Sequence, residues 1–436
     1  MDKKKRVLIV VNNYLEDSLI SAKRWRSLSR FFAKDNEVVV ICGLDYMYKG
    51  KLIDKSNLEN ENLKIHQLNT TDSLIIRKRK IVREETNITV SEETKNKDGL
   101  LKSIIQYVKL FLYYIIVKRR SIKIMKSNRK IINNFKPDIV ISSIFYYNAF
   151  FMGKYIHKAI KNSVFITEVR DRMTYGDHIN KYELPIMYKL EKNILKSSDL
   201  VFTVTEQIKD EILSDFNNRE YLDKIIVFPH AYDSNEDSIE VNHEPEKTDF
   251  LELCFTGTMY EEDYLIFGTL FDVIMNNETL KNKVRLHYAG TKDYLINDIS
   301  QKHYFLNNIV NHSLLTKKEA LLLQKTCDVI IYRGGTFAGK GPEILFANKY
   351  VLCLYDDKNG LCLNMPTIIS KANIGTSFSI SENKEYLEDV LMKLVKEKED
   401  YKDIRVNPNY DFINNFSIDQ IGLQMIKTIE SFEEKR

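Results

Sequence analysis

Short runs of consecutive apolar residues recur along the chain and alternate with segments that have the spacing of amphipathic helices. The first apolar run covers residues 7–11, a helical stretch follows at 21–33, and a second apolar run covers 37–43. An uninterrupted apolar strand is typical of a parallel sheet that is covered on both faces. A strand, a helix and a second strand in this order therefore predict a β/α/β unit at the start of the chain.

The same alternation continues in two series, which are separated by a polar and acidic stretch at residues 234–249. The further strands that we predict lie at 63–66, 137–142, 162–168, 199–205 and 225–230 in the first series, and at 251–257, 284–290, 308–310, 328–332 and 351–354 in the second. Strands that alternate with helices form doubly wound α/β domains. We therefore predict a Rossmann-like domain over 1–233, a linker over 234–249, a second Rossmann-like domain over 250–410, and a last helix within 411–436.

The composition fits a globular protein of two domains. A chain of 436 residues is too long for one core, and 44% apolar and 11% aromatic residues are values of folded proteins. The net charge of +4 and the lack of a recognised binding motif argue against nucleic acid as a partner. The five cysteines form no CxxC pair, which favours reduced thiols and a cytoplasmic protein. We find no signal peptide, and the longest apolar run, 110–117, is too short to cross a bilayer.

One segment has an uneven charge. Between residues 99 and 130 there are nine basic residues and no acidic one, and apolar residues alternate with them at helical spacing. We predict a basic amphipathic helix over 99–134. Its uniform charge favours a helix that lies on an anionic membrane surface, so we expect a peripheral protein on the inner face of the cell membrane. The alternative is a domain helix that packs its apolar face inside and keeps its lysines in water.

A glycine-rich turn follows the predicted strand at 328–332. Gly339 and Gly341 would let the backbone approach a ligand closely, and Pro342 suits the first turn of a helix. The free N–H groups at such a helix start can hold a diphosphate. Glu343 would accept hydrogen bonds from the two hydroxyls of a ribose. The alternative is an ordinary turn from strand to helix with a solvated Lys340.

Several segments, taken in order, resemble the GT-B glycosyltransferases, and specifically the large retaining family 4 (group 1), whose bacterial members build capsule and O-antigen polysaccharides. The segments that carry the resemblance are 164–171, which ends in an Arg-Asp pair, 190–206, the loop at 228–233, the glycine turn at 255–259, and 328–343, which ends in a Gly-Lys-x-x-Glu form. The resemblance covers nearly the whole chain. It implies two Rossmann-like domains with a cleft between them and a last helix that crosses back to the first domain.

The resemblance implies a transfer of a sugar from a UDP- or GDP-linked donor to a lipid-linked glycan acceptor, with retention and without a metal or other cofactor. The departing diphosphate gains negative charge, which cations and N–H groups must stabilise. The second domain would bind the donor and the first the acceptor. The residues that we expect to take part are Gly257, Thr258, Arg333, Gly339, Lys340, Gly341 and Glu343 for the donor, Glu168, Arg170 and Asp171 for catalysis, and Asn12, Asn13 and Tyr14 on the acceptor side.

The chain departs from the family pattern at three places, and one of them is the histidine after the Asp-Val strand, where residues 142–146 have none. Gly335 stands where the family has the first of two glutamates. Glu261, Glu262 and Asp263 follow the glycine turn, where an Arg and a Lys would bind the diphosphate, and we expect these acids to repel phosphate. The departures favour the alternative of a non-catalytic GT-B subunit that binds another transferase or a glycan. A nucleotide-sugar epimerase is a weaker alternative, because the histidines and glutamates of such a site are not evident.

Overall fold

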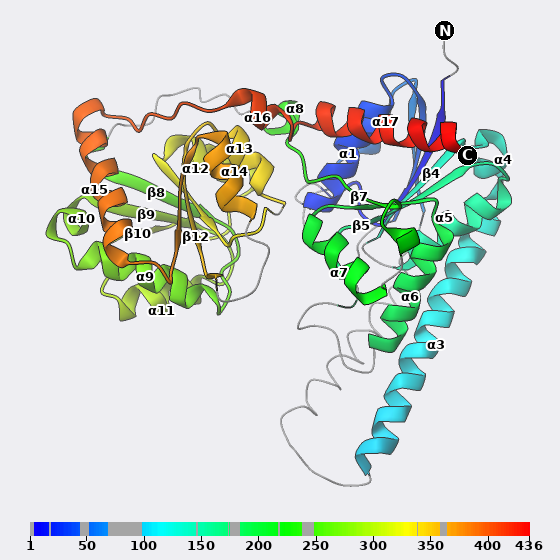
Figure 1. The fold of residues 1–436 in the computed structure, drawn as a ribbon, viewed down its shortest axis with the longest axis horizontal. Coiled ribbons are helices and arrows are strands. Elements are labelled where there is room, and N and C mark those ends of the chain that lie inside the picture. Colours follow the sequence, from blue (N-terminus) through cyan, green and yellow to red (C-terminus); the bar gives the residue numbers. More distant parts are fainter. Residues whose placement is uncertain are drawn as a thin grey trace. The chain divides into compact units, whose positions relative to one another are not determined.

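A computed structural model describes residues 4–16, 19–43, 52–68, 98–144, 147–172, 174, 184–216, 219–237, 248–337, 339–357 and 364–436. The chain forms two compact units (Figure 1). The first unit comprises Met1–Pro229 and Gly422–Arg436, and the second comprises His230–Ile421. The predicted boundaries lay at 233 and 411, and most of the predicted linker lies outside the described residues.

The described part of the first unit contains a sheet of seven parallel strands in the order β3-β2-β1-β4-β5-β6-β7. Its apolar strands are buried on both faces, as the run pattern predicted, with Leu8, Ile141 and Phe165 completely covered. The strands are β1 (Arg6–Val11), β2 (Glu37–Cys42), β3 (Leu63–Gln67), β4 (Ile139–Ile144), β5 (Val164–Val169), β6 (Leu200–Thr203) and β7 (Ile225–Val227).

The helices of this unit pack against its sheet. They are α1 (Ile20–Phe32), α3 (Asp98–Ser127), α4 (Arg129–Phe135), α5 (Tyr147–Ala159), α6 (Leu184–Ser197), α7 (Glu206–Phe216), and the 3-10 turns η1 (Lys55–Asn57) and η2 (Arg219–Tyr221). The single helix predicted over 99–134 is wrong in one respect. Asn128 leaves the helical conformation, with φ −104° and ψ 22°, and divides the segment into α3 and α4.

The described part of the second unit repeats this plan with six parallel strands in the order β10-β9-β8-β11-β12-β13. The strands are β8 (Leu251–Thr256), β9 (Val284–Ala289), β10 (Ile309–Asn311), β11 (Val329–Arg333), β12 (Tyr350–Tyr355) and β13 (Gly375–Ser379). The helices are α8 (Ser234–Asp237), α9 (Asp263–Met275), α10 (Glu278–Lys283), α11 (Asp293–Lys302), α12 (Lys317–Thr326), α13 (Gly341–Phe346), α14 (Asn364–Ala372), α15 (Lys384–Tyr401), α16 (Tyr410–Asn414) and the 3-10 turn η3 (Leu306–Asn308). The predicted fold class, two doubly wound α/β units, is confirmed.

The last helix, α17 (Ile418–Lys435), ends in the first unit. Gly422 packs there against the ring of Phe31, and a Cβ atom at this glycine would lie only 2.3 Å from the ring. Lys5 also holds the helix through an ion pair of 2.9 Å with Glu433. The end of the chain is therefore part of the first core.

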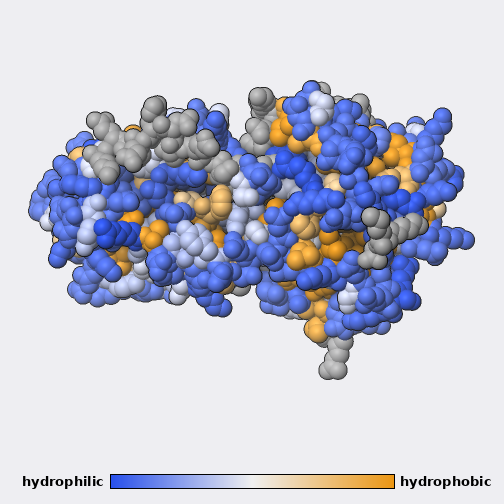
Figure 2. All heavy atoms as spheres, turned by 90° about the horizontal axis from the view of Figure 1, so that it is seen from above, coloured by the Kyte–Doolittle hydropathy of each residue, from blue (hydrophilic) through white to orange (hydrophobic). Residues whose placement is uncertain are grey.

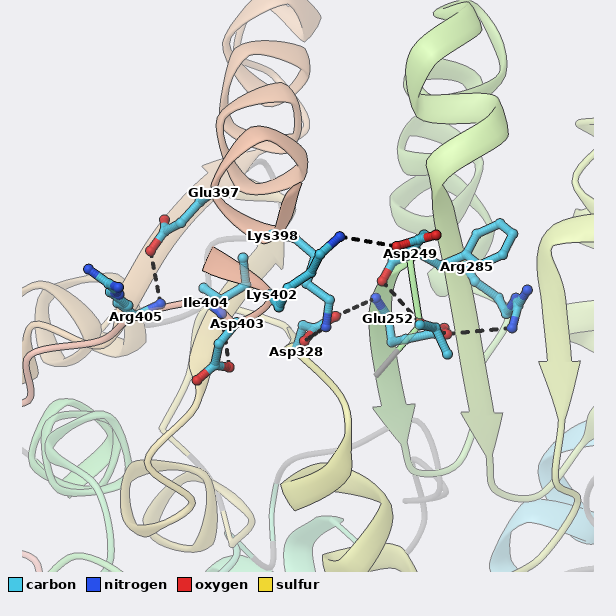
Figure 3. A network of polar contacts seen from close by, with 12 residues as sticks. Asp249, Glu252, Arg285, Asp328, Glu397, Lys398, Lys402, Asp403, Ile404 and Arg405 are labelled. Atoms are coloured by element: carbon cyan, nitrogen blue, oxygen red, sulfur yellow. Dashed lines mark hydrogen bonds and ion pairs between the residues drawn. The ribbon is translucent and has the colours of Figure 1, made fainter. Parts of the chain in front are cut away.

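Charged side chains hold the amino ends of the strands in the second unit (Figure 3). Asp328, just before β11, accepts the backbone N–H of Glu252 at 2.9 Å and forms a buried ion pair of 2.7 Å with Lys398 of α15. Glu252 contacts Arg285 of β9 at 3.4 Å. These partners are all protein groups, so this edge of the sheet has a structural function.

The face of the molecule seen in Figure 2 is mostly hydrophilic, and hydrophobic residues reach its surface in smaller patches. Among the described residues, no helix is long and apolar enough to span a membrane. The four described cysteines, Cys42, Cys254, Cys327 and Cys353, are buried and free.

Candidate functional site

The strand order of the second unit places the turn at Gly257, after β8, next to the end of β11. The order reverses between β8 and β11, and in open α/β sheets ligands bind beyond the carboxyl ends of the strands at such a reversal. Gly257 directly follows β8, and Arg333 is the last residue of β11. Two of the predicted donor residues therefore lie at the position where this fold class binds ligands.

Lys340 reaches this same point from the loop before α13. Its Nζ atom donates to the carbonyl oxygen of Thr256, the last residue of β8, over 2.5 Å. Gly257 has φ +157°, and a Cβ atom there would lie 3.5 Å from the Lys340 ammonium. Burial lowers the pKa of Lys340, and Glu343 partly opposes this shift. The predicted alternative of a solvated lysine is therefore wrong: the ammonium is held inside the site.

The start of α13 agrees with the prediction for Pro342 but not with the prediction for Gly341. α13 begins at Gly341, with Pro342 in its first turn. The space beside Gly341 is filled by the ring of Phe337, which would lie 2.5 Å from a Cβ atom. Gly341 is thus explained by packing rather than by the approach of a ligand. Gly339 lies in the half-buried turn before it.

Glu343 projects from the first turn of α13 and is largely buried. Its side chain is 12% exposed, and Lys317 of α12 places its Nζ atom 3.6 Å from the carboxylate. Thr258, on the other side of the turn, accepts a hydrogen bond of 2.9 Å from the Thr291 hydroxyl. The loop before α13 and the end of β8 therefore bring together Lys340, Glu343, Gly257 and Thr258 within one unit.

Asp263 is the residue of this region that the sequence did not identify correctly. Its carboxylate is completely buried at the start of α9, accepts the backbone N–H of Tyr260 at 2.8 Å, and lies 3.2 Å from Nε of Arg333. Burial raises the pKa of Asp263, while Arg333 acts in the opposite direction. We predicted that three acids would repel phosphate here, but Asp263 is instead turned inward as the partner of Arg333, and only Glu261 and Glu262 are exposed.

The aromatic ring of Tyr260 completes this cluster. The guanidinium carbon of Arg333 lies 4.9 Å from the ring centroid, and the Lys292 ammonium lies 5.1 Å from it. Two cations on one ring hold that ring in place by cation–π attraction. The carboxyl edge of the second sheet therefore combines several cations with an exposed aromatic side chain.

In the first unit, Glu168 near the end of β5 is a buried anion with several partners. Oε1 accepts Nε of Arg24 at 2.8 Å, and Oε2 accepts the Trp25 indole at 2.7 Å and the Ser143 hydroxyl at 2.6 Å. Burial alone would raise the pKa of Glu168, but Arg24, Arg170 and the Ser143 bond outweigh it and lower the pKa. A general base must reach the proton that it removes. With both oxygens occupied and no exposure, Glu168 has a structural function in this chain, and its catalytic function stays a prediction.

Arg170 and Asp171 follow Glu168 and differ from each other. Arg170 is buried, and its Nε atom has no hydrogen-bond partner, although it lies 3.8 Å from Oε2 of Glu168. Burial lowers the pKa of Arg170. Asp171 is exposed. Asp171 is therefore the predicted catalytic residue with an exposed carboxylate, and its charge acts on the neighbouring Arg170 guanidinium.

The predicted acceptor residues at the end of β1 are all buried. Asn12 donates to the Asn148 side chain at 2.6 Å. Tyr14 is completely covered, and its hydroxyl bonds to Ser29 at 2.6 Å, while burial raises the pKa of Tyr14 to about 12. Asn13 is different, because its Oδ1 atom is buried and has no hydrogen-bond partner. Tyr14 thus belongs to the core, and Asn13 stays the predicted acceptor contact.

Sequence reasoning also missed a charged cluster around Arg172. This buried guanidinium contacts Glu191 of α6 at 2.9 Å and Asp215 of α7 at 2.5 Å. Its position two residues after Arg170 was the available signal, but neither carboxylate is near it in sequence. The cluster joins the loop after β5 to two helices, which is a structural function. Among the residues that the structure describes, no group of His, Cys, Asp or Glu side chains could hold a metal ion.

Comparison with known proteins finds similarity in fold rather than in sequence. No protein-family profile matches the chain, and no curated protein matches it in sequence. A glycosyltransferase from Rickettsia africae ESF-5 superposes with a TM-score of 0.60 at 15% identity, over 100% of both chains. Sucrose-phosphate synthase from Thermosynechococcus elongatus superposes with a TM-score of 0.58 at 9% identity, over 99% of this chain and 100% of that one.

A UDP-GlcNAc 2-epimerase from Methanocaldococcus jannaschii is also similar, with a TM-score of 0.50 at 14% identity, over 98% of this chain and 99% of that one. Identities this low establish the fold and not the activity. The strand orders, the two units and these full-length superpositions agree on one architecture: the chain has the GT-B fold.

Proposed function

We propose that this protein is a glycosyltransferase that moves a sugar from a nucleotide sugar to a glycan acceptor. The observation that carries the proposal is the half-buried Lys340 side chain, whose ammonium lies against Thr256 and beside Gly257 at the strand reversal of the second unit. A buried cation at a ligand-binding edge has no need of that position for stability alone, since burial costs free energy. Glu343 compensates this charge only in part, and a diphosphate would supply further negative charge.

The surrounding residues suit the other parts of such a donor. Arg333 would contact the diphosphate together with Lys340, because cations placed in advance stabilise the charge that develops on the leaving group. The Glu343 carboxylate would accept hydrogen bonds from the ribose hydroxyls. Lys317, at 3.6 Å, would help to orient that carboxylate. No metal is required for this arrangement.

We assign the acceptor to the first unit, through Asp171 and Asn13. Asp171 would take the proton from the attacking hydroxyl. The Arg170 guanidinium beside it would place a positive charge near the reacting groups. Transfer with retention, membership of family 4, a lipid-linked acceptor and a place in bacterial capsule or O-antigen synthesis are the finer points of the proposal. They rest on the segments from 164–171 to 328–343 that resemble this family.

Two observations favour a second function. Arg333 already has a buried anionic partner in Asp263, so one cation of the predicted donor site is neutralised within the protein. Gly335 in place of a family glutamate points in the same direction. A non-catalytic GT-B subunit, which binds another transferase or a glycan, is the function that these two features would fit.

A calorimetric titration with UDP, GDP and their sugar conjugates distinguishes the two functions. We expect the wild-type chain to bind one nucleotide class, and Glu343→Ala to weaken it about tenfold, which corresponds to ~1.4 kcal/mol for a lost ribose contact. Glu382→Ala, which removes an exposed carboxylate of the same unit, is the matched control and should bind as wild type. A folded wild-type chain that binds none of these nucleotides would favour the non-catalytic subunit.

A further inference from the structure

The outward face of α3 carries a continuous stripe of exposed side chains. Four apolar residues, Ile105, Val108, Leu112 and Ile116, are between 40% and 51% exposed. They are three or four positions apart, which places them above one another on the same side of a helix. The next positions of this face are Arg119, Lys123 and Lys126, which are exposed as well. We call these seven residues the α3 stripe.

The opposite face of α3 is already used by the core of the first unit. Leu110, Val117 and Met125 are buried in the same cluster as the residues of α5. Tyr114 packs edge-on against Phe151 of α5, with ring centroids 5.4 Å apart. The helix is therefore fixed by one side and presents the stripe on the other, and in Figure 1 its first turns extend beyond α5 and α6. The stripe is a surface of the folded unit and not an unpacked core helix.

The stripe has two halves of different chemistry. The apolar half extends over about 16 Å of helix, and the complete stripe over about 32 Å, at 1.5 Å per residue. No acidic residue occurs between Gly99 and Lys130, so nothing in this part of the sequence neutralises Arg119, Lys123 and Lys126. A partner that fits this surface must offer an apolar layer next to a layer of negative charge.

A second copy of the chain does not meet this requirement. In a parallel pair of α3 helices, the three cations would face the same three cations of the copy. In an antiparallel pair, the cations of each copy would face the apolar half of the other. Both arrangements bury or oppose positive charge without an acid, which is unfavourable. The surface of an anionic bilayer does meet the requirement, because acyl chains lie directly beneath phosphate groups.

We propose that the α3 stripe binds the surface of an anionic membrane, with Ile105, Val108, Leu112 and Ile116 entering the acyl boundary and Arg119, Lys123 and Lys126 contacting lipid phosphates. This inference does not depend on the proposed transferase activity, because it concerns a surface of the first unit and needs no nucleotide. It uses the orientation of the helix, which the sequence pattern alone left open.

The experiment is co-sedimentation of the full chain with vesicles of phosphatidylglycerol and phosphatidylcholine, and with vesicles of phosphatidylcholine alone. We expect binding to the anionic vesicles only. The variant Arg119→Gln/Lys123→Gln/Lys126→Gln should bind about 100-fold more weakly, since each basic residue near an anionic surface contributes ~1 kcal/mol. The variant Leu112→Asn/Ile116→Asn should lose binding although it keeps every charge.

The matched control is Lys371→Gln/Lys393→Gln/Lys396→Gln, which removes three exposed lysines from the second unit. It should bind the anionic vesicles as wild type does. An equal loss in this control would mean that only net charge matters, and would overturn the proposal. Wild-type self-association that Leu112→Asn/Ile116→Asn abolishes would also overturn it, in favour of an interface between copies. Because the substituted side chains are exposed, thermal unfolding should change little and shows whether each variant is folded.

Discussion

The two units share a strand order but differ at the carboxyl edges of their sheets. In the first unit, Glu168 is a carboxylate with no exposure, and its partners Arg24, Trp25 and Ser143 are all protein groups. In the second unit, Lys340 is an ammonium whose hydrogen bond goes to the backbone of Thr256 beside a glycine, and the Glu343 carboxylate compensates the cost of its burial only in part. At the first edge, protein side chains compensate the charge of Glu168. At the second edge, an anionic ligand can compensate the charge of Lys340.

This difference separates stability from binding. A buried ion pair whose partners are satisfied is expensive to break, because removal of one charge leaves the other without compensation. A cation whose burial is only partly compensated, as that of Lys340 is by Glu343, costs stability and becomes useful when an anionic ligand binds. Substitutions at the two edges should therefore affect different quantities, and the following predictions test that separation from the largest effect to the smallest.

Glu168→Ala should produce the largest change, in the free energy of unfolding. It leaves the guanidinium groups of Arg24 and Arg170 buried without their carboxylate, which costs about 3–5 kcal/mol. Urea denaturation followed by circular dichroism measures this loss. Asp171→Asn, three residues later and exposed, is the control and should change stability by less than about 0.5 kcal/mol. A stable Glu168→Ala variant that had lost only transferase activity would return Glu168 to a catalytic function.

Lys340→Met should leave stability nearly unchanged and weaken nucleotide binding. Methionine fills a similar volume without a charge, so the desolvation cost disappears together with the contact to the diphosphate. We expect binding to fall between tenfold and 100-fold, or ~1.4–2.7 kcal/mol. Calorimetry with the nucleotide that the wild-type chain binds measures the effect. Lys318→Met, the same change at an exposed position of α12, should have none. A large loss of stability with unchanged binding would show that the second edge is structural like the first.

Much of this fold could be predicted from the sequence, because the central strands are apolar on both faces and leave a clear run. β13 (Gly375–Ser379) could not, because in the described sheet it is an edge strand beside β12, and its first three residues are half-exposed and polar or glycine. The break at Asn128 was also missed, since the apolar spacing continues through it.

The site was less predictable than the fold, because its contacts join distant residues. Lys340 was identified from the glycine turn, but its contact with Thr256 depends on the pairing of β8 with β11. Arg24 and Glu168 are 144 positions apart, and no local pattern indicates that they pair. Asp263 follows two exposed acids and resembles them in sequence, although the fold turns it inward towards Arg333. Charged residues can be placed only when the strand order is known.

Asp263→Asn should have the opposite effect and strengthen nucleotide binding by the second unit. An asparagine keeps the acceptor for the Tyr260 N–H but releases Arg333 from its ion pair, so the guanidinium can turn to a diphosphate. We expect nucleotide binding to improve by a few-fold, or less than ~1 kcal/mol. Because burial raises the pKa of Asp263, its charge is a cost to the folded state, and water can reach the half-exposed Arg333, so stability should fall little. Weaker binding by this variant would mean that Asp263 orients Arg333 rather than competes for it.

The smallest expected effect is the dependence of stability on pH in each unit. Burial lowers the pKa of His157 in the first unit and of His312 in the second, where His287 adds to the shift. A histidine whose folded pKa lies below its unfolded value, near 6.5, takes up its proton more readily when the chain unfolds. Its contribution is therefore constant above that value and is lost as the pH falls below it.

Thermal unfolding between pH 7 and pH 5 tests this in variants of both units. His157→Gln should make the stability of the first unit depend less on pH, because it removes the imidazole that stacks on Phe165 and bonds to Ser163. His312→Gln should do the same for the second, while His287 keeps its bond to Glu252. If both variants followed the wild-type curve, the loss of stability in this range would come from other groups. If one variant alone flattened the curve, only the histidine that it replaces would account for the loss of stability in this range.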